Sequence, residues 1–529
     1  MKRKFNVTGT CIPEKHYMVN IDNKLNEIMK LVEDEEYFII NRPRQYGKTT
    51  ALYLLNKTLM GKEEYLPIKI SFEAIDSESY NEVKSFLNTL IAQIRNYFKF
   101  NKNKDMFEFT NKYYDKVNSM HEFSDFITNI VEYTGKKVVL IIDEIDKSSN
   151  NQLFLDFLGM LRNKYLLRNE GQDFTFHSVI LAGVHDVKSL KIKIRPNEEH
   201  KYNSPWNIAS DFDVDMSFSS KEIMTMLDNY CEDKKVQMDK EYFAKKLYYY
   251  TSGYPFLVSK LCKIIDEKIM TLEIKNSKVP IWKNEFLERA VKILLKESNT
   301  NFDSLIKNLE NNKELSELVC NIVIDGREFS YNADNSTINI GLIYGIFKEN
   351  EGKLKINNRI YEQRIYDYKT SIVETSIDFD NYNFKDQFIA PKETLDLEKV
   401  LLKFQQFMKK EHSQKLRKFL ENDGRLVFLA FLSPIINGTG FAFKEVQTSE
   451  EKRLDITITY GKKMSIIETK RWRGEAAHEK GLKQLWDYLE INDLDYGYLL
   501  IFDFRREENR DRVVEEIEIE GKKIFSVWV

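Results

Sequence analysis

The sequence has 529 residues, enough for about three or four domains of ordinary size. Hydrophobic residues make up 42% of the chain, so it can bury several large cores. Its 80 Lys and Arg residues nearly balance its 83 Asp and Glu residues, which excludes a uniformly basic nucleic-acid-binding protein. Any surface for nucleic acid must therefore be a local patch.

The chain also lacks the signals of secreted and membrane proteins. Its four cysteines are widely scattered, without the paired spacing of a metal site or a disulfide framework. The basic N-terminus precedes no apolar signal segment, and no run approaches the roughly 18 apolar residues of a membrane span. We expect a cytoplasmic protein with no membrane partner.

Residues 41–50, NRPRQYGKTT, lie between an expected strand at 37–40 and an expected helix from 51. A strand, a tight loop and a helix with Gly-Lys-Thr at the junction form the context of a phosphate-binding P-loop. Backbone N–H groups and the helix N-terminus face the anion there. Lys48 would neutralise charge on the β- and γ-phosphates, and the Thr49 hydroxyl would ligate Mg²⁺.

We therefore expect ATP and Mg²⁺ at this loop. The first glycine of the usual motif is replaced by Arg42, so a vestigial loop stays open as an alternative. The expected nucleotide-binding residues are Arg44, Gln45, Tyr46, Gly47, Lys48, Thr49 and Thr50.

A second motif starts with five consecutive Val, Leu and Ile residues at 138–142 and ends in Asp143 and Glu144. Such a run predicts a strand buried on both faces, as in a parallel sheet. Its acidic end lies where sheets of this kind bind ligands. Asp143 would hold Mg²⁺ and Glu144 would polarise the attacking water. A strand that merely ends in solvated acids is the alternative.

Further strands are expected at 66–72 and 178–184, with helices at 80–133 and 151–166. This alternation predicts an α/β, doubly wound sheet with right-handed crossovers. His185 or Asp186 follows the last strand as a candidate γ-phosphate sensor. Arg195 is a candidate arginine finger, although a solvated loop arginine is the alternative.

The pattern becomes helical from Ser219, and Gly253-Tyr254-Pro255 begins an apolar helix expected at 256–270. Residues 284–368 combine short helices with two short strands, which predicts a winged-helix-like region. Such a region could read DNA or pack as part of a helical lid.

Taken together, the lead-in at 9–18, the loop at 42–50, Asp143-Glu144 and the Ser252–Pro255 segment resemble the AAA-like, STAND-type P-loop ATPases of prokaryotes. The resemblance covers about residues 5–370. It implies an ATP-binding core with a helical lid, and a loop that often begins with a residue other than glycine. Arg42 is compatible with that pattern.

After an acidic, turn-rich linker, the C-terminal residues show the order α-β-β-β-α-β. Glu468 and Lys470 are two apart on an expected strand, so they share one face. A turn at 460–462 could bring Asp455 beside Glu468. Two carboxylates suit Mg²⁺, with Mn²⁺ as an alternative, and Lys470 would orient or deprotonate the nucleophile. Residues 470–473 add phosphate-binding charge and the Trp472 ring for base stacking.

This order and spacing resemble the PD-(D/E)XK nuclease superfamily, with Asp455, Glu468 and Lys470 at its motif positions. The resemblance also implies roles for Glu421 on the first helix and Gln484 on the following one. The alternative is an amphipathic hairpin with solvated charges.

The expected fold is a doubly wound P-loop core, a helical lid and a winged-helix-like region, followed by an α/β restriction-endonuclease-like domain. The expected boundaries are 1–218, 219–285, 286–369, a linker at 370–397, and 398–529. The leading hypothesis is ATP-gated cleavage of nucleic acid, with DNA favoured, in prokaryotic defence. Its rival is a STAND-like signalling switch that binds nucleic acid without cutting it. Homo-oligomer formation is left open.

Overall fold

The structure is a computed structural model, and it forms two compact units: residues 1–315 with 330–360, and residues 316–329 with 361–529. Among the helices that it describes, none combines the length and apolarity needed to cross a bilayer. The described residues are 3–148, 151–184, 206–273, 280–324, 327–376, 388–390, 394–410, 414–436, 440–443, 456–460, 463–505 and 514–529.

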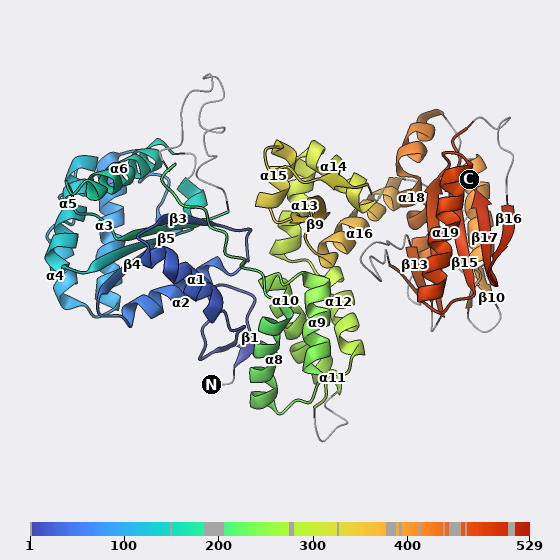
Figure 1. The fold of residues 1–529 in the computed structure, drawn as a ribbon, viewed down its shortest axis with the longest axis horizontal. Coiled ribbons are helices and arrows are strands. Elements are labelled where there is room, and N and C mark those ends of the chain that lie inside the picture. The colour runs from blue at the N-terminus through green and yellow to red at the C-terminus, as the bar shows by residue number, and fades with distance from the viewer. Residues whose placement is uncertain are drawn as a thin grey trace. The chain divides into compact units, whose positions relative to one another are not determined.

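The first unit contains a four-stranded parallel sheet with the order β3-β6-β5-β4 (Figure 1). Strand β6, the last of these four along the chain, therefore lies between β3 and β5, the two strands that lead into the predicted motifs. All four predicted strands are present, and β5 is buried over six of its seven residues, as expected for a strand covered on both faces. The strands are β3 (Tyr37–Asn41), β4 (Tyr65–Ser71), β5 (Lys137–Asp143) and β6 (Ser178–Gly183).

The segments that connect these strands form helices, because their apolar residues recur every three or four positions. In α3, for example, Phe86, Leu90 and Ile94 all face the apolar core. A short parallel pair, β1 (Lys4–Phe5) and β2 (His16–Tyr17), precedes the sheet. The helices are α1 (Asp22–Glu33), α2 (Lys48–Met60), α3 (Val83–Phe100), α4 (Lys104–Asn111), α5 (Met120–Thr134) and α6 (Gln152–Asn169).

A helical segment follows the sheet and begins where the sequence predicts. Ser219 caps α8 through a reciprocal pair of hydrogen bonds with Glu222. The single helix expected at 256–270 is instead two helices joined by a π-helical turn, Ile265–Ile269, which keeps both of those isoleucines buried. The helices are α8 (Ser220–Lys234), α9 (Lys240–Thr251), α10 (Pro255–Ile264), α11 (Met270–Glu273) and α12 (Glu285–Lys296).

The next residues form short helices and an antiparallel hairpin, β8 (Phe347–Asn350) with β9 (Lys353–Ile356). The helix after the hairpin, α16 (Arg359–Ser376), runs into the segment expected to be a linker, because Thr370 and Val373 continue its buried face. The other elements are α13 (Thr300–Asn311), α14 (Lys313–Val323), β7 (Phe329–Ser330) and α15 (Ser336–Ile343).

The second unit is built on a mixed six-stranded sheet with the order β12-β13-β14-β15-β17-β16. The predicted order α-β-β-β-α-β is found from α18 to β15: β12, β13 and β14 are antiparallel, and β15 returns parallel to β14. Helix α19 makes that crossover and covers one face of the sheet (Figure 1), where Leu485 and Tyr488 pack on Ile466 and Leu499.

The C-terminal hairpin extends this sheet beyond the predicted frame. The elements are β10 (Ile389–Ala390), β11 (Thr394–Leu395), α17 (Leu397–Lys410), α18 (Gln414–Ile436), β12 (Gly440–Phe443), β13 (Ile456–Tyr460), β14 (Lys463–Arg471), α19 (Glu475–Ile491), β15 (Tyr496–Phe502), β16 (Val514–Ile519) and β17 (Lys522–Trp528).

Candidate functional site

The loop between β3 and α2 has the backbone of a phosphate-binding turn. Gly47 precedes the helix with φ 82°, in the left-handed region that favours glycine. Gln45 also has a positive φ, 58°. The first N–H groups of α2, starting at Lys48, have no partner inside the helix, so they are donors for an anion.

Lys48 is buried, with 6% of its surface exposed, and its ammonium points back into the loop. The Nζ atom donates to the carbonyl of Arg42 at 2.7 Å and to that of Pro43 at 3.0 Å. Burial lowers the pKa of Lys48, while the nearby carboxylates, Asp146 foremost, act in the opposite direction. Lys48 is therefore positioned inside the turn that would surround a phosphate.

Asp143 is the last residue of β5 and Glu144 follows it, and both lie beside the start of α2. Asp143 is 4% exposed, and its Oδ1 accepts from the Glu144 N–H at 3.0 Å. Glu144 has a positive φ of 55°, unusual for a residue with a side chain. Its pKa is raised by burial and, after that, by the charge of Asp143. A carboxyl group with a raised pKa is suited to exchange a proton with water.

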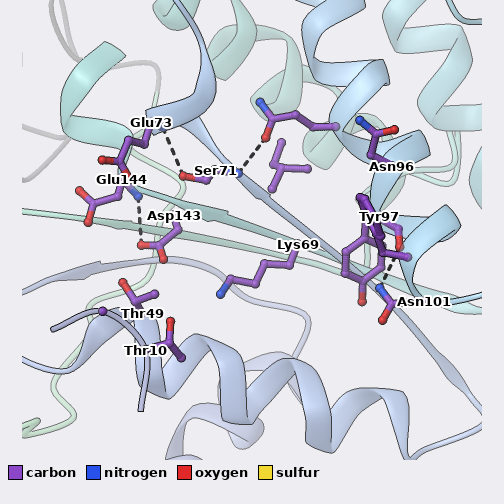
Figure 2. Close-up of a pocket in the computed structure, with 14 residues that line it drawn as sticks. Thr10, Thr49, Lys69, Ser71, Glu73, Asn96, Tyr97, Asn101, Asp143 and Glu144 are labelled. Atoms are coloured by element: carbon purple, nitrogen blue, oxygen red, sulfur yellow. Dashed lines mark hydrogen bonds between the residues drawn. The ribbon is translucent and has the colours of Figure 1, made fainter. Parts of the chain in front are cut away.

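Thr49, Asp143 and Glu144 line one pocket of about 650 Å³ (Figure 2). A hydroxyl and a carboxylate are oxygen ligands of the kind that Mg²⁺ prefers, so this lining fits the metal expected here. The predicted motif residues are thus brought together by the fold, although they are about 95 positions apart in the sequence.

Asp146 is a residue of this site that the sequence analysis missed. Its carboxylate accepts from the backbone N–H of Val184 at 2.7 and 2.9 Å. A Cβ added at Gly183 would lie 2.7 Å from Ile145, so the end of β6 fits closely against the segment after β5. The only sequence signal was an acid three positions after Asp143.

The guanidinium of Arg42 does not point into the phosphate-binding turn. Its Nη2 donates to the carbonyls of Phe212 at 3.1 Å and Val214 at 2.9 Å, and its guanidinium lies 5.1 Å from the Phe212 ring centre. The residue lacks the positive φ that would require glycine. Arginine at this position therefore anchors the loop to residues 212–214.

Three residues beyond the sheet contact the P-loop within the same unit; we call Tyr254, Thr300 and Gly345 the clamp. The Tyr254 hydroxyl donates to the Arg44 carbonyl at 2.6 Å, and its ring meets that of Tyr46 edge-on at 4.7 Å. The clamp's other two residues hold neighbouring loop positions. Gln45 donates to Thr300 at 3.2 Å, and a Cβ added at Gly345 would lie 2.7 Å from Pro43.

Thr50, expected to bind nucleotide, has a partner within the protein, and three other candidate residues lie outside the described part of the chain. Thr50 accepts a hydrogen bond from the Cys11 N–H at 3.0 Å, which joins the N-terminal lead-in to the loop helix. The candidate sensors His185 and Asp186 and the candidate finger Arg195 lie outside the described residues.

The second unit brings Glu468 and Lys470 together on β14. Their side chains form an ion pair with 2.6 Å between Oε1 and Nζ, and Glu468 is 1% exposed. Lys470 lies against α19, since a Cβ added at Gly481 would be 3.2 Å from its Cγ. Gln484 is half-buried on that helix, three residues after Gly481.

The remaining members of the expected second site are not placed. Asp455 lies outside the described residues, and of Glu421 only the backbone, within α18, is described. No group of three potential His, Cys, Asp or Glu metal ligands is found in the part of the chain that the structure describes. Arg425 instead reaches β14, where it donates to the Thr469 carbonyl at 2.7 Å.

Trp472 is less available for base stacking than expected. Its indole is half-buried and packs against the core under α19. The Arg505 guanidinium lies 4.8 Å from its ring centre, and His478 lies 5.9 Å away. Arg505 is held there by paired hydrogen bonds to the buried Asp503. A base would have to compete with this cation for the ring.

Comparison with known proteins gives one family match. A family described as an AAA-like domain matches residues 17–364, about two thirds of the chain. No curated protein matches the sequence. Among solved structures, the chain is similar to a Walker-type ATPase of Pyrococcus abyssi, at 11% identity and a TM-score of 0.45, over 68% of this chain and 99% of that one.

Two further solved structures are similar over comparable lengths. The ORC2 protein of Aeropyrum pernix is 11% identical with a TM-score of 0.35, over 66% of this chain and 93% of that one. The Cdc6p of Pyrobaculum aerophilum is 13% identical with a TM-score of 0.34, over 68% and 97%.

Proposed function

Because the chain belongs to the AAA-like domain family, we propose that its first unit binds ATP with Mg²⁺ at residues 44–50 and hydrolyses it. One observation carries the proposal: Thr49, Asp143 and Glu144, from two separate motifs, line the same pocket beside the phosphate-binding turn. A strand that merely ended in solvated acids would not bring its carboxylates to that turn.

Each residue has a role that follows from its position. The N–H groups at the start of α2 bind phosphate oxygens, and Lys48 moves its ammonium from the loop carbonyls to the β- and γ-phosphates. Thr49 and Asp143 would hold Mg²⁺, which neutralises phosphate charge. Glu144 orients the attacking water and receives its proton.

Titration calorimetry with ATP and Mg²⁺ tests this proposal. Wild type should bind one ATP per chain, and Lys48→Ala should weaken binding at least about 10-fold because it removes a phosphate contact. Glu144→Gln should keep the affinity and lose hydrolysis. If wild type does not bind ATP, or Lys48→Ala binds it equally well, the loop is vestigial.

We further propose that the second unit is a metal-dependent nuclease whose cleavage of nucleic acid, DNA in the first instance, depends on the nucleotide state of the first. Support comes from the α-β-β-β-α-β order and from Glu468 and Lys470 on one strand. Glu468 is the carboxylate among the described residues, and Asp455 would supply the second one for Mg²⁺ or Mn²⁺. A setting in prokaryotic defence rests on the family resemblance alone.

One observation favours the rival function, a switch that binds nucleic acid without cutting it. Glu468 is almost fully buried, and Lys470 already neutralises its charge at 2.6 Å. Such a pair can be structural, because a buried carboxylate needs a partner. Asp455→Ala separates the two: a nuclease loses cleavage and keeps binding, whereas in a binding-only protein wild type and variant bind alike and neither cuts.

A further inference from the structure

A second lysine, Lys69 on β4, lines the pocket of the proposed ATP site. Lys69 lies on β4, where it pairs with Ile141, and two residues later Ser71 pairs with Asp143. Paired residues on neighbouring strands share a face, and so do residues two apart. Lys69, Ser71 and Asp143 therefore project to one side of the sheet, away from the apolar cluster that contains Ile68 and Ile70.

Lys69 extends into the pocket that Thr49 and Asp143 line. Figure 2 shows its side chain directed from β4 toward the side of the pocket where those two residues lie. The other charged residues of the lining are acids, Glu73, Asp143 and Glu144, so Lys69 is the one cation of the lining among the described residues. The neutral lining includes Gln93 and Asn96 of α3 and Asn101, which follows that helix.

The Lys69 side chain is only partly exposed, and no described residue neutralises its ammonium through an ion pair. Across the residues that the structure describes, no hydrogen bond or ion pair involves it; its one electrostatic neighbour is Asp143. Partial burial lowers its pKa, while the nearby charge of Asp143 acts in the opposite direction. An anionic ligand in the pocket would give this partly buried ammonium a partner of opposite charge.

Lys48 and Lys69 approach Asp143 by different routes. Lys48 lies within the loop and donates to two of its carbonyls, and it does not line the pocket. Asp143 influences the pKa of both ammonium groups. A γ-phosphate beside a metal held by Thr49 and Asp143 would thus meet one cation from the loop and the other from the pocket.

We propose that Lys69 is a catalytic residue of the ATP hydrolysis proposed above, contacting the γ-phosphoryl oxygens as negative charge shifts during transfer. In that reaction the water oxygen forms a bond to the γ-phosphorus, and the bond to the oxygen bridging the β- and γ-phosphorus atoms breaks. The water proton passes to Glu144 and then to solvent, and ADP and phosphate leave. Lys69 stays protonated throughout, so its contribution is electrostatic.

The inference rests on the proposed ATP site, so its test uses binding in place of turnover. Calorimetry measures the affinity for ADP with Mg²⁺, and then for ADP with Mg²⁺ and aluminium fluoride, which mimics the phosphoryl group in transfer. The proteins are wild type, Lys69→Met, Lys69→Arg and the control Lys57→Met, an exposed lysine of α2 that pairs with Glu14 outside the pocket. Melting temperatures verify that each variant is folded.

Lys69→Met should bind ADP as wild type does and lose at least about 10-fold in affinity when aluminium fluoride is present, since a donor aimed at the transition state acts chiefly there. Lys69→Arg should recover part of the loss, and Lys57→Met should show none. Unchanged binding of the fluoride complex by Lys69→Met overturns the inference, and so does an equal loss for both ligands. If wild type does not bind ADP, the ATP site itself is refuted.

Discussion

The hydroxyl of Tyr254 donates a 2.6 Å hydrogen bond to the backbone carbonyl of Arg44, two hundred and ten residues earlier in the chain. Tyr254 precedes helix α10, and Arg44 lies in the P-loop. Because this bond fixes a backbone group of the loop, it restricts the loop before any nucleotide arrives. A restricted loop has less conformational entropy to lose on binding.

Tyr254→Phe should therefore weaken ATP binding about 3- to 5-fold, since one hydrogen bond contributes about 1 kcal/mol. The free energy of unfolding should fall by a similar amount. Calorimetry and thermal melting measure the two effects. Tyr248→Phe, at an exposed position of α9, is the matched control and should change neither. Wild-type values for Tyr254→Phe in both measurements would show that this contact does not organise the loop.

Gly345 offers a second test of the clamp. It has φ 69°, and an added Cβ would lie 2.7 Å from Pro43, so Gly345→Ala combines backbone strain with a clash. Gly352 has a similar φ of 75° and nothing near an added Cβ, so Gly352→Ala carries the strain alone. We expect Gly345→Ala to be the more destabilised of the two by about 1–3 kcal/mol. Equal melting temperatures would exclude a close contact at Pro43.

Arg42→Gly restores the first glycine of the usual P-loop motif, yet we expect it to impair the protein. The substitution removes the hydrogen bonds to Phe212 and Val214 and adds backbone freedom at a position without a positive φ. The stability loss should be about 2–3 kcal/mol, with weaker ATP binding. A variant that binds ATP more tightly than wild type would mean that Arg42 is a defect of the loop.

The Glu468–Lys470 pair predicts non-additive stability effects. Lys470→Met leaves a buried carboxylate without this ion pair, so it should destabilise the protein by about 2–4 kcal/mol. Glu468→Gln should cost less, because the Lys470 side chain is 30% exposed and water can solvate its ammonium. The double variant should lose less than the sum of the two. Lys480→Met, at an exposed position of α19, serves as the control. Additive losses in chemical denaturation would show that the two charges do not interact.

The sequence predicts the strands and local motifs well because their signals are short. The run at 138–142 shows its burial through composition, and Gly47 shows the turn through the backbone freedom that the loop needs. The hairpin carrying Glu468 and Lys470 is also recognisable, since alternate residues of a strand share a face.

Features formed between distant segments were not predictable in the same way. The contacts of Tyr254, Thr300 and Gly345 with the loop join residues more than 200 positions apart, and no local pattern encodes such pairs. Arg42 looked like a weak match to the P-loop motif because it replaces a glycine. Its role in the loop was not recognisable from the sequence, since its partners at 212 and 214 lie far along the chain.

Burial explains two further differences between expectation and structure. Trp472 was expected to be free for a base, but a sequence does not reveal that Arg505 lies over its ring. Helix α16 extends past its predicted end because Thr370 and Val373 continue its buried face. The sequence did not indicate this, since most neighbours of these two residues are polar and weaken the periodic signal.

The central claim, that nucleotide at the P-loop controls cleavage by the second unit, is tested most directly by one cleavage assay. Single- and double-stranded DNA and RNA are incubated with Mg²⁺, with and without ATP, and with wild type, Lys48→Ala or Lys470→Ala. The account predicts that wild type cuts at least one substrate in an ATP-dependent manner, that Lys48→Ala loses the response to ATP, and that Lys470→Ala does not cut. Cleavage by wild type that is the same with and without ATP, or none on any substrate, would contradict it.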